Sequence, residues 1–352
     1  MSEIAVNAIT DASGGSTASI NGLTPTVSNM AGRNRLINSD MRIDQRNAGA
    51  AVTLNTWGGQ FPVDRFRGNV RPSIGTISAQ QSTVVPSGQG FYNSLKLTQA
   101  SVTTEAANDV YAFGQVIEGY NIQEFQFGTA EAKELVLSFW VRSSVTGTYC
   151  VSFQNSSSDR SLVKEYTISV ADTWQKINIS FSADSAGTWL TNNSVGLYVL
   201  WDLGSGTDYQ TTPNSWASAS GGNRSSANQV RWIDTSGATF FITGVQLEAG
   251  SVATPFEHRQ YGQELALCQR YTEVISVNAV SHVLTINNVQ YIHVFFKQTK
   301  RATPTYSTNS GTWQGATPTI ASINSENVRL QADANTAFYS NNDVSILINA
   351  EL

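Results

Sequence analysis

The sequence predicts an all-β protein built around a jelly-roll β-sandwich. From Phe91 onward, short runs with apolar residues at every second position alternate with clusters of Gly, Ser, Asn and Thr, which is the pattern of many strands joined by turns. A helical period is convincing over only one stretch, residues 261–272. About eight strands with so little helix favour a jelly roll over an α/β fold.

Composition and charge exclude several classes of function. The chain has 352 residues, enough for two or three domains, and only 13% of them are charged, about half the usual share. The formal net charge is −5 and there is no basic run, so we expect no nucleic-acid binding. There is no signal-peptide pattern and no apolar run near 18 residues in length. We therefore expect synthesis in the cytoplasm and no membrane insertion.

Residues 1–33 are rich in Ser, Thr, Asn, Gly and Ala and are predicted to be an extended N-terminal segment. This composition buries too little apolar area to order the segment alone. A floppy terminus is the plain interpretation. The alternative is docking on another subunit through four spaced apolar residues, Ile20, Leu23, Val27 and Met30.

Two strands are predicted with the most regular alternation. In Glu134–Arg142 the odd positions from Leu135 to Val141 are apolar, while Ser138 and Arg142 point the other way. In Trp174–Phe181, isoleucine and phenylalanine alternate with polar residues. Further strands are expected at Ser94–Leu97, Ala112–Tyr120, Thr148–Phe153, Tyr166–Val170, Val195–Trp201 and Thr239–Leu247.

These patterns divide the rest of the chain into three parts. A jelly roll is predicted over residues 34–260, interrupted by a long polar loop at 202–228 of the kind that is usually functional or disordered. Residues 261–272 are predicted to be a linking helix, because Tyr261, Leu265 and Cys268 stand at helical spacing. Residues 273–352 return to strand patterns, for instance at Tyr291–Phe296 and Ser345–Asn349, and predict a small C-terminal β domain.

The usual anchors of enzyme chemistry are missing from the sequence. His258, His282 and His293 show no metal-ligand spacing, and there is no nucleophile elbow, phosphate-binding loop or dinucleotide fingerprint. Cys150 and Cys268 are too far apart for a metal site and are expected to be buried thiols. We expect no catalytic residues, no metal and no cofactor.

Glycoside hydrolysis is the one enzymatic alternative, because it needs only two carboxylates facing each other across a groove. The central region is too short for the long parallel β-helix that is usual in polysaccharide-degrading tailspikes. The acidic residues available are more simply read as turn or strand-edge groups: Asp64, Glu105, Glu118 and Glu124.

The eight tryptophans need weighing, because indole faces stack on sugar rings. Trp140 and Trp201 lie on predicted strands and are expected to pack in the core, and Trp174 opens its hairpin. Trp216 and Tyr209 lie in the long polar loop and are the candidate glycan-binding residues. A contact between subunits would explain an exposed Trp216 equally well.

Two long segments carry a resemblance to a known family. They are GRNRLINSDMRIDQRNAGAAVT at Gly32–Thr53, followed by VDRFRG at Val63–Gly68, and TFFITGVQLEAGSVATPFEHRQYGQELALCQRY at Thr239–Tyr271. Both resemble segments of phage and prophage tail-fibre proteins of the marine and cyanobacterial phage type. The resemblance extends over about Gly32–Thr272.

This family is similar to jelly-roll carbohydrate-binding modules, and the resemblance implies a non-enzymatic virion structural protein of tail-fibre type. It implies a homotrimer that attaches to other virion proteins through residues 1–33 and binds a host-surface polysaccharide for adsorption. The location implied is the tail or another external part of the virion. No residues match the structural calcium site of some such modules. The alternatives left open are a head- or connector-associated structural protein that binds no sugar and, with less support, a polysaccharide-degrading tailspike.

Overall fold

The protein is described by a computed structural model, in which most of the chain from residue 32 onward is placed. The expected N-terminal segment lies almost wholly outside the described residues, as do Glu105 and His282. The described residues are 32–72, 75–101, 106–218, 221–277, 290–311, 313–315, 318–332, 338–339 and 344–352.

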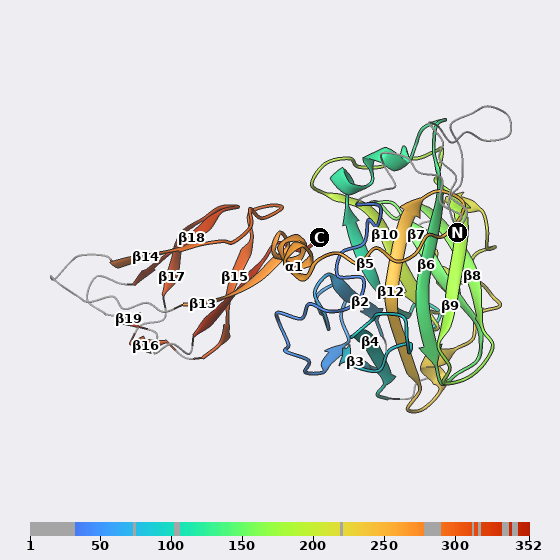
Figure 1. Ribbon diagram of the computed structural model, residues 1–352, viewed down its shortest axis with the longest axis horizontal. Helices are drawn as coiled ribbons and strands as arrows, with labels where there is room; N and C mark the ends of the chain where they lie inside the picture. Colours follow the sequence, from blue (N-terminus) through green and yellow to red (C-terminus); the bar gives the residue numbers. More distant parts are fainter. Residues whose placement is uncertain are drawn as a thin grey trace, which may run out of the picture.

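The chain forms a large β-sandwich and a smaller β lobe, which the helix α1 (Tyr261–Gln269) joins (Figure 1). Two six-stranded antiparallel sheets make up the sandwich, which confirms the predicted all-β jelly-roll class. The first sheet has the order β1 (Val52–Leu54), β3 (Ile77–Ser82), β4 (Ser94–Gln99), β12 (Thr239–Ala249), β6 (Glu134–Ser143) and β9 (Gln175–Ser182). The second has the order β11 (Trp216–Ser218), β8 (Arg160–Ile168), β7 (Gly147–Gln154), β10 (Val195–Asp202), β5 (Val110–Glu118) and β2 (Phe66–Arg71).

Aromatic side chains from both sheets meet between the layers. Trp201 of β10 is fully buried, as predicted; its ring stacks on Phe113 at 5.8 Å and meets the edge of Phe139 at 5.6 Å. Tyr149 and Phe240 extend this cluster, with ring centroids 5.7 Å apart. Burying such large rings supplies much of the driving force for folding, at about 25 cal/mol per Å² of apolar surface removed from water.

Several strands escape sequence prediction. Three of them, β1, β2 and β3, precede Phe91, and β11 lies within the long polar loop. The burial of β2 does not alternate, because residues on both of its faces are buried. Four short 3-10 turns complete the sandwich, at Gly119–Asn121 (η1), Gln123–Phe125 (η2), Thr207–Tyr209 (η3) and Trp232–Asp234 (η4).

The N-terminal residues 34–39 take the place of a strand beside β12. Strand β4 pairs only with residues 239–242 of β12. Beyond that point, the amide N–H of Arg35 donates to the Leu247 carbonyl at 3.0 Å, and that of Val245 donates to the Ser39 carbonyl at 2.9 Å. The Asn34 side chain donates to the Val245 carbonyl at 2.9 Å and accepts from the Leu247 N–H at 3.1 Å.

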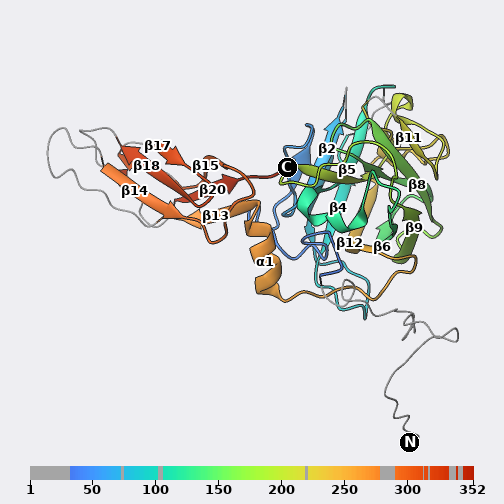
Figure 2. The ribbon, with the colours of Figure 1, turned by 90° about the horizontal axis from the view of Figure 1, so that it is seen from above.

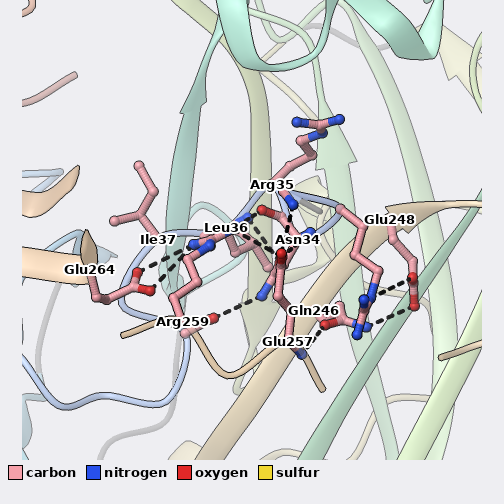
Figure 3. A network of polar contacts seen from close by, with 12 residues as sticks. Asn34, Arg35, Leu36, Ile37, Gln246, Glu248, Glu257, Arg259 and Glu264 are labelled. Atoms are coloured by element: carbon pink, nitrogen blue, oxygen red, sulfur yellow. Dashed lines mark hydrogen bonds and ion pairs between the residues drawn. The ribbon is translucent and has the colours of Figure 1, made fainter. Parts of the chain in front are cut away.

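Polar contacts continue this pairing into the residues before α1 (Figure 3). The Glu257 carboxylate accepts from the Asn34 N–H at 2.9 Å, and the Glu257 N–H donates to the Gln246 side chain at 2.8 Å. The Arg259 guanidinium donates to the Leu36 carbonyl at 3.0 Å and contacts Glu264 of α1 at 3.4 Å. We call this network, from Asn34 to Glu264, the clasp. It joins the segments Gly32–Thr53 and Thr239–Tyr271.

Helix α1 ends at Gln269, three residues before the predicted end at 272. Tyr271 stands at helical spacing from Leu267, but its burial does not come from packing within a helix. Its hydroxyl donates to Glu118 at 2.7 Å, and the Arg65 guanidinium lies 3.5 Å from the centre of its ring. The chain turns at this contact, and β13 (Thr272–Ser276) begins directly after it.

The C-terminal lobe is a second, smaller β structure with its own apolar core. That core contains Trp313, Val328, Leu330, Ile346 and Ile348. The described strands of the lobe form three small sheets. The first has the order β13, β20 (Ser345–Asn349) and β15 (Thr305–Ser310), and the second has the order β14 (Gln290–Phe295), β18 (Asn327–Ala332) and β17 (Thr319–Ile323). The third pairs β16 (Gln314–Gly315) with β19 (Phe338–Tyr339).

Charged groups hold the lobe to the sandwich, and the C-terminus returns to this junction (Figure 2). Glu351 pairs with Arg46 at 3.0 Å and also with Arg65. Arg270 pairs with Glu118 at 2.6 Å. Burial lowers the pKa of Arg65 to about 10, so this guanidinium stays charged at neutral pH.

The clasp predicts that Asn34→Ala lowers the free energy of unfolding by about 1 to 3 kcal/mol, because it leaves buried backbone groups of β12 without partners. Chemical denaturation measures this change. Asn55→Ala, which removes an exposed amide, is the control and should cost under about 0.5 kcal/mol. Equal losses in the two variants would contradict the role assigned to Asn34.

Candidate functional site

A groove of about 460 Å³ opens on the outer face of the first sheet. It is larger than the hollow of about 290 Å³ in the long loop and the one of about 170 Å³ beside the clasp. Its lining comes from β6, β9, β12 and the segments around residues 90 and 255, and consists of Gln89, Phe91, Ser138, Trp140, Lys176, Gly244, Ala253, Pro255, Phe256 and His258.

Strand register brings Trp140 and Lys176 together in the groove. Trp140 of β6 is paired with Lys176 of β9 on one side and with Thr243 of β12 on the other. Directly opposite residues in an antiparallel pair project from the same face, with Cβ atoms about 5 Å apart. Ser138 lies two residues along β6 and therefore faces the same way. The indole of Trp140 is half-buried, which leaves part of its surface open to a ligand.

The opposite wall of the groove is aromatic. Phe91 meets Phe256 edge-on with ring centroids 5.1 Å apart, and His258 lies 5.5 Å from Phe91 and 4.9 Å from Phe256. Gly244 makes room for this wall, because a Cβ atom there would lie 2.5 Å from the Phe91 ring. Its φ of +60° also favours glycine.

Several polar groups in the groove have no partner among the described residues. They are the Trp140 indole N–H, the Ser138 hydroxyl, the Gln89 amide and the Lys176 ammonium. Ligand sites usually combine apolar walls with a few such groups, which fix the orientation of the ligand. The groove therefore has both the shape and the free hydrogen-bonding groups of a binding site.

Among the described residues that line the groove there is no Asp or Glu. Asp40 interacts electrostatically with His258 of the lining and pairs with Arg42. Burial raises the pKa of the Asp40 carboxyl, against the attraction of Arg42. The described lining offers hydrogen-bonding groups to a polar ligand but no pair of carboxylates for acid–base chemistry.

The described acidic residues considered for hydrolysis form ion pairs and hydrogen bonds outside the groove. Asp64 is buried, accepts from Gln45 at 2.6 Å and contacts Arg46 at 3.4 Å; burial raises the pKa of its carboxyl. Glu118 is bound by Arg270 and Tyr271, and Glu124 pairs with Arg35.

The two aromatic residues predicted to hold glycan lie apart from this groove. The Trp216 indole donates to the Ser182 carbonyl at 2.8 Å and meets Phe127 and Trp189 edge-on. Tyr209 packs on the outer face of the second sheet, with the Arg224 guanidinium 4.7 Å from its ring centre. Neither side chain lines the hollow in the long loop. Their contact with glycan stays a prediction.

The expectation that Trp140 packs in the core is wrong. Its even position in β6 places it on the outer face, together with Ser138 and Arg142, while the odd positions fill the core. The alternation visible in the sequence contained this information. What the sequence could not supply is the wall of Phe91, Phe256 and His258, which comes from two distant segments.

The described part of the chain contains no helix long and apolar enough to cross a bilayer and no cluster of three or more side chains suited to a metal ion. Cys150 and Cys268 are buried and unbridged, as expected.

Solved structures show similarity in fold, whereas no protein-family model and no curated protein matches the sequence. A carbohydrate-binding module of family 11 from a Clostridium thermocellum cellulase is 12% identical, with a TM-score of 0.30, over 61% of this chain and 100% of that one. A family 61 module in complex with β-1,4-galactotriose is 10% identical, with a TM-score of 0.29, over 62% and 99%.

The enzymatically active domain of tailspike protein 4 from bacteriophage CBA120 is 13% identical, with a TM-score of 0.31, over 62% of this chain. The match spans only 21% of that tailspike chain. These similarities concern the arrangement of strands. The tail-fibre family expected from Gly32–Thr53 and Thr239–Tyr271 stays a prediction.

The groove predicts that Gly244→Ala destabilises the protein and displaces Phe91. The positive φ alone costs roughly 1 to 2 kcal/mol, and the steric overlap with Phe91 adds to it. Gly237→Ala is a matched control, since Gly237 has a φ of +67° and nothing within 4 Å of its added Cβ. Thermal unfolding of both variants isolates the effect of the overlap. Equal shifts in Tm would show that Phe91 can move away freely.

Proposed function

We propose that this chain is a non-enzymatic virion structural protein of tail-fibre type, which holds a host-surface glycan in the groove beside Trp140. The observation that carries the proposal is the half-open indole of Trp140, set among polar groups that have no partner in the described chain.

The chemistry of the groove fits a saccharide. A sugar ring offers an apolar face of C–H groups, which stacks on an indole, and a rim of hydroxyls, which donate and accept hydrogen bonds. Ser138 and Gln89 can both donate and accept, and the Trp140 N–H can donate. The volume of about 460 Å³ falls within the range of about 300 to 1,000 Å³ that is usual for ligand sites.

We propose binding without hydrolysis because the described lining of the groove contains no carboxyl group. Glycoside cleavage uses two carboxyl groups that flank the scissile bond. The described lining contributes none, and the acidic residues Asp64, Glu118 and Glu124 are held in ion pairs outside the groove.

The tail-fibre role is supported by the sequence resemblance and by the elongated form of the molecule. The two resembling segments meet in the clasp, next to the helix that carries the C-terminal lobe (Figure 3). Attachment to other virion proteins through residues 1–33 and assembly as a homotrimer belong to the same proposal. Three weak sites on one trimer could gain about 10² to 10⁴ in avidity over a single site.

A glycan array probed with the full-length protein tests the function, and Trp140→Ala tests the site. We expect this substitution to lower glycan affinity at least about tenfold, because it removes the stacking surface. Trp57→Ala is the control, since Trp57 is 48% exposed and lies against Arg224 on another face.

Trp216→Ala decides between the groove and the long loop. Loss of binding in this variant with Trp140→Ala unaffected would assign the site to the loop. If the wild-type protein binds no glycan and does not compete with phage adsorption, the receptor-binding role fails. A head- or connector-associated structural role would then be the better hypothesis.

The absence of catalysis has its own measurement. We expect no new reducing ends after prolonged incubation of the full-length protein with host polysaccharide, because no carboxylate faces the groove among its described lining residues. Release of oligosaccharide would overturn the non-enzymatic proposal.

A further inference from the structure

We infer that the groove selects acidic saccharides, with an anionic group of the sugar paired to Lys176 while the sugar ring lies on Trp140. This inference rests on the proposed function, because it assumes that the groove holds a sugar.

Lys176 is placed to receive an anion. It is exposed, it lies directly across the β6–β9 pairing from Trp140, and no acidic group pairs with it in the part of the chain that the structure describes. Strand β9 is the edge of its sheet, and no further strand of the described chain pairs along its outer side. A ring stacked on Trp140 would therefore bring its substituents within reach of Lys176.

The next row of side chains on the same face adds two cations. Arg142 of β6 and Lys96 of β4 lie on either side of Phe241 of β12, at 5.3 and 5.9 Å from its ring centre. Arg142 hydrogen-bonds to Asp172 at 3.2 Å, whereas Lys96 has no ion pair among the described residues. These two rows carry three cations, and Asp172 pairs with one of them, whereas Glu134 and Glu248 lie further along the same outer face, on β6 and β12.

The described lining of the groove contains no acidic residue, which favours an anionic ligand over a neutral one. A groove for neutral sugars has no need to exclude carboxylates from its walls, and Asp or Glu are common acceptors for sugar hydroxyls. In this groove an acidic ligand meets no like charge from the described lining residues, and it gains an ion pair that a neutral sugar cannot form. The shared chemistry is an anionic saccharide, whether the charge comes from a carboxylate or a sulfate.

An edge-strand lysine can also have a purely protective role, because exposed charges on edge strands prevent pairing with other chains. The experiment must therefore separate ligand selection from edge protection. The probe is an array of oligosaccharide pairs, in which each uronate- or sialate-bearing member stands beside its carboxyl-reduced counterpart, with sulfated and unsulfated pairs as a second arm.

We expect the full-length protein to bind the acidic member of a pair about tenfold more tightly than its neutral counterpart. Lys176→Gln should abolish this preference while binding of the neutral member persists, and Lys176→Glu should reverse it. Lys133→Gln is the control: Lys133 is equally exposed but precedes β6 at the far end from Trp140, roughly 20 Å away along the strand. Preference in both arms, or in one alone, supports the inference and identifies the anion.

The possible failures are distinguishable. Equal binding of both members of each pair, with Lys176→Gln unchanged and Trp140→Ala impaired, would overturn the inference and leave the groove as a neutral-sugar site. A lower Tm or aggregation of Lys176→Gln with unaltered selectivity would assign Lys176 to edge protection and also overturn it. Absence of any glycan binding by the wild-type protein would instead remove the proposed function.

Discussion

Strand β12 departs from the regular ladder of its sheet between Thr243 and Gln246, and the neighbouring chain is arranged around that departure. At this point β4 stops pairing with β12, and residues 34–39 supply the missing partner through backbone bonds and the Asn34 amide. On the outer face, Gly244 leaves space that Phe91 fills. One local irregularity thus creates both the clasp and the aromatic wall of the groove, which is how bulges commonly serve a fold.

The strands of the sandwich were predictable where apolar residues recur at short intervals between clusters of turn residues. Glu134–Arg142 was predicted almost to the residue, because every odd position from Leu135 to Val141 is apolar and fills the core, although Val136 and Ser138 on the outer face are buried as well. Strand β2 was missed because its short alternation is interrupted by Gly68 and Asn69, two residue types that are rare in strands. The sequence also suggested an open Trp216, but the short strand β11 pairs with β8 and folds its indole against the core.

The candidate site was predictable only in part. Alternation assigns Trp140 to the outer face, and with it Ser138 and Arg142. The remaining wall depends on Phe91, Phe256 and His258, which lie in segments without strand pattern and about 165 residues apart in the sequence. Long-range packing of that kind leaves no local periodicity from which it could be predicted.

Buried ion pairs lie at the junction between the sandwich and the C-terminal lobe. The side chains of Arg65, Arg46 and Glu351 are buried together. Lys300 pairs with Glu273 at 2.8 Å in the same region, and both of these side chains are fully buried. Such groups are costly to bury unless each is paired, so alternative orientations of the lobe that separate them are strongly disfavoured. These ion pairs therefore fix one orientation of the lobe on the sandwich more than they add to the stability of the contact.

The chain enters the C-terminal lobe next to Tyr271 and leaves it next to Glu351, and the two strands involved, β13 and β20, are hydrogen-bonded neighbours. The lobe is therefore fastened at two adjacent points instead of one. A single connection would allow the lobe to rotate about it, whereas two adjacent connections resist torsion about the long axis of the molecule. A sideways load at the distal end would then be transmitted to the sandwich as by a stiff lever arm.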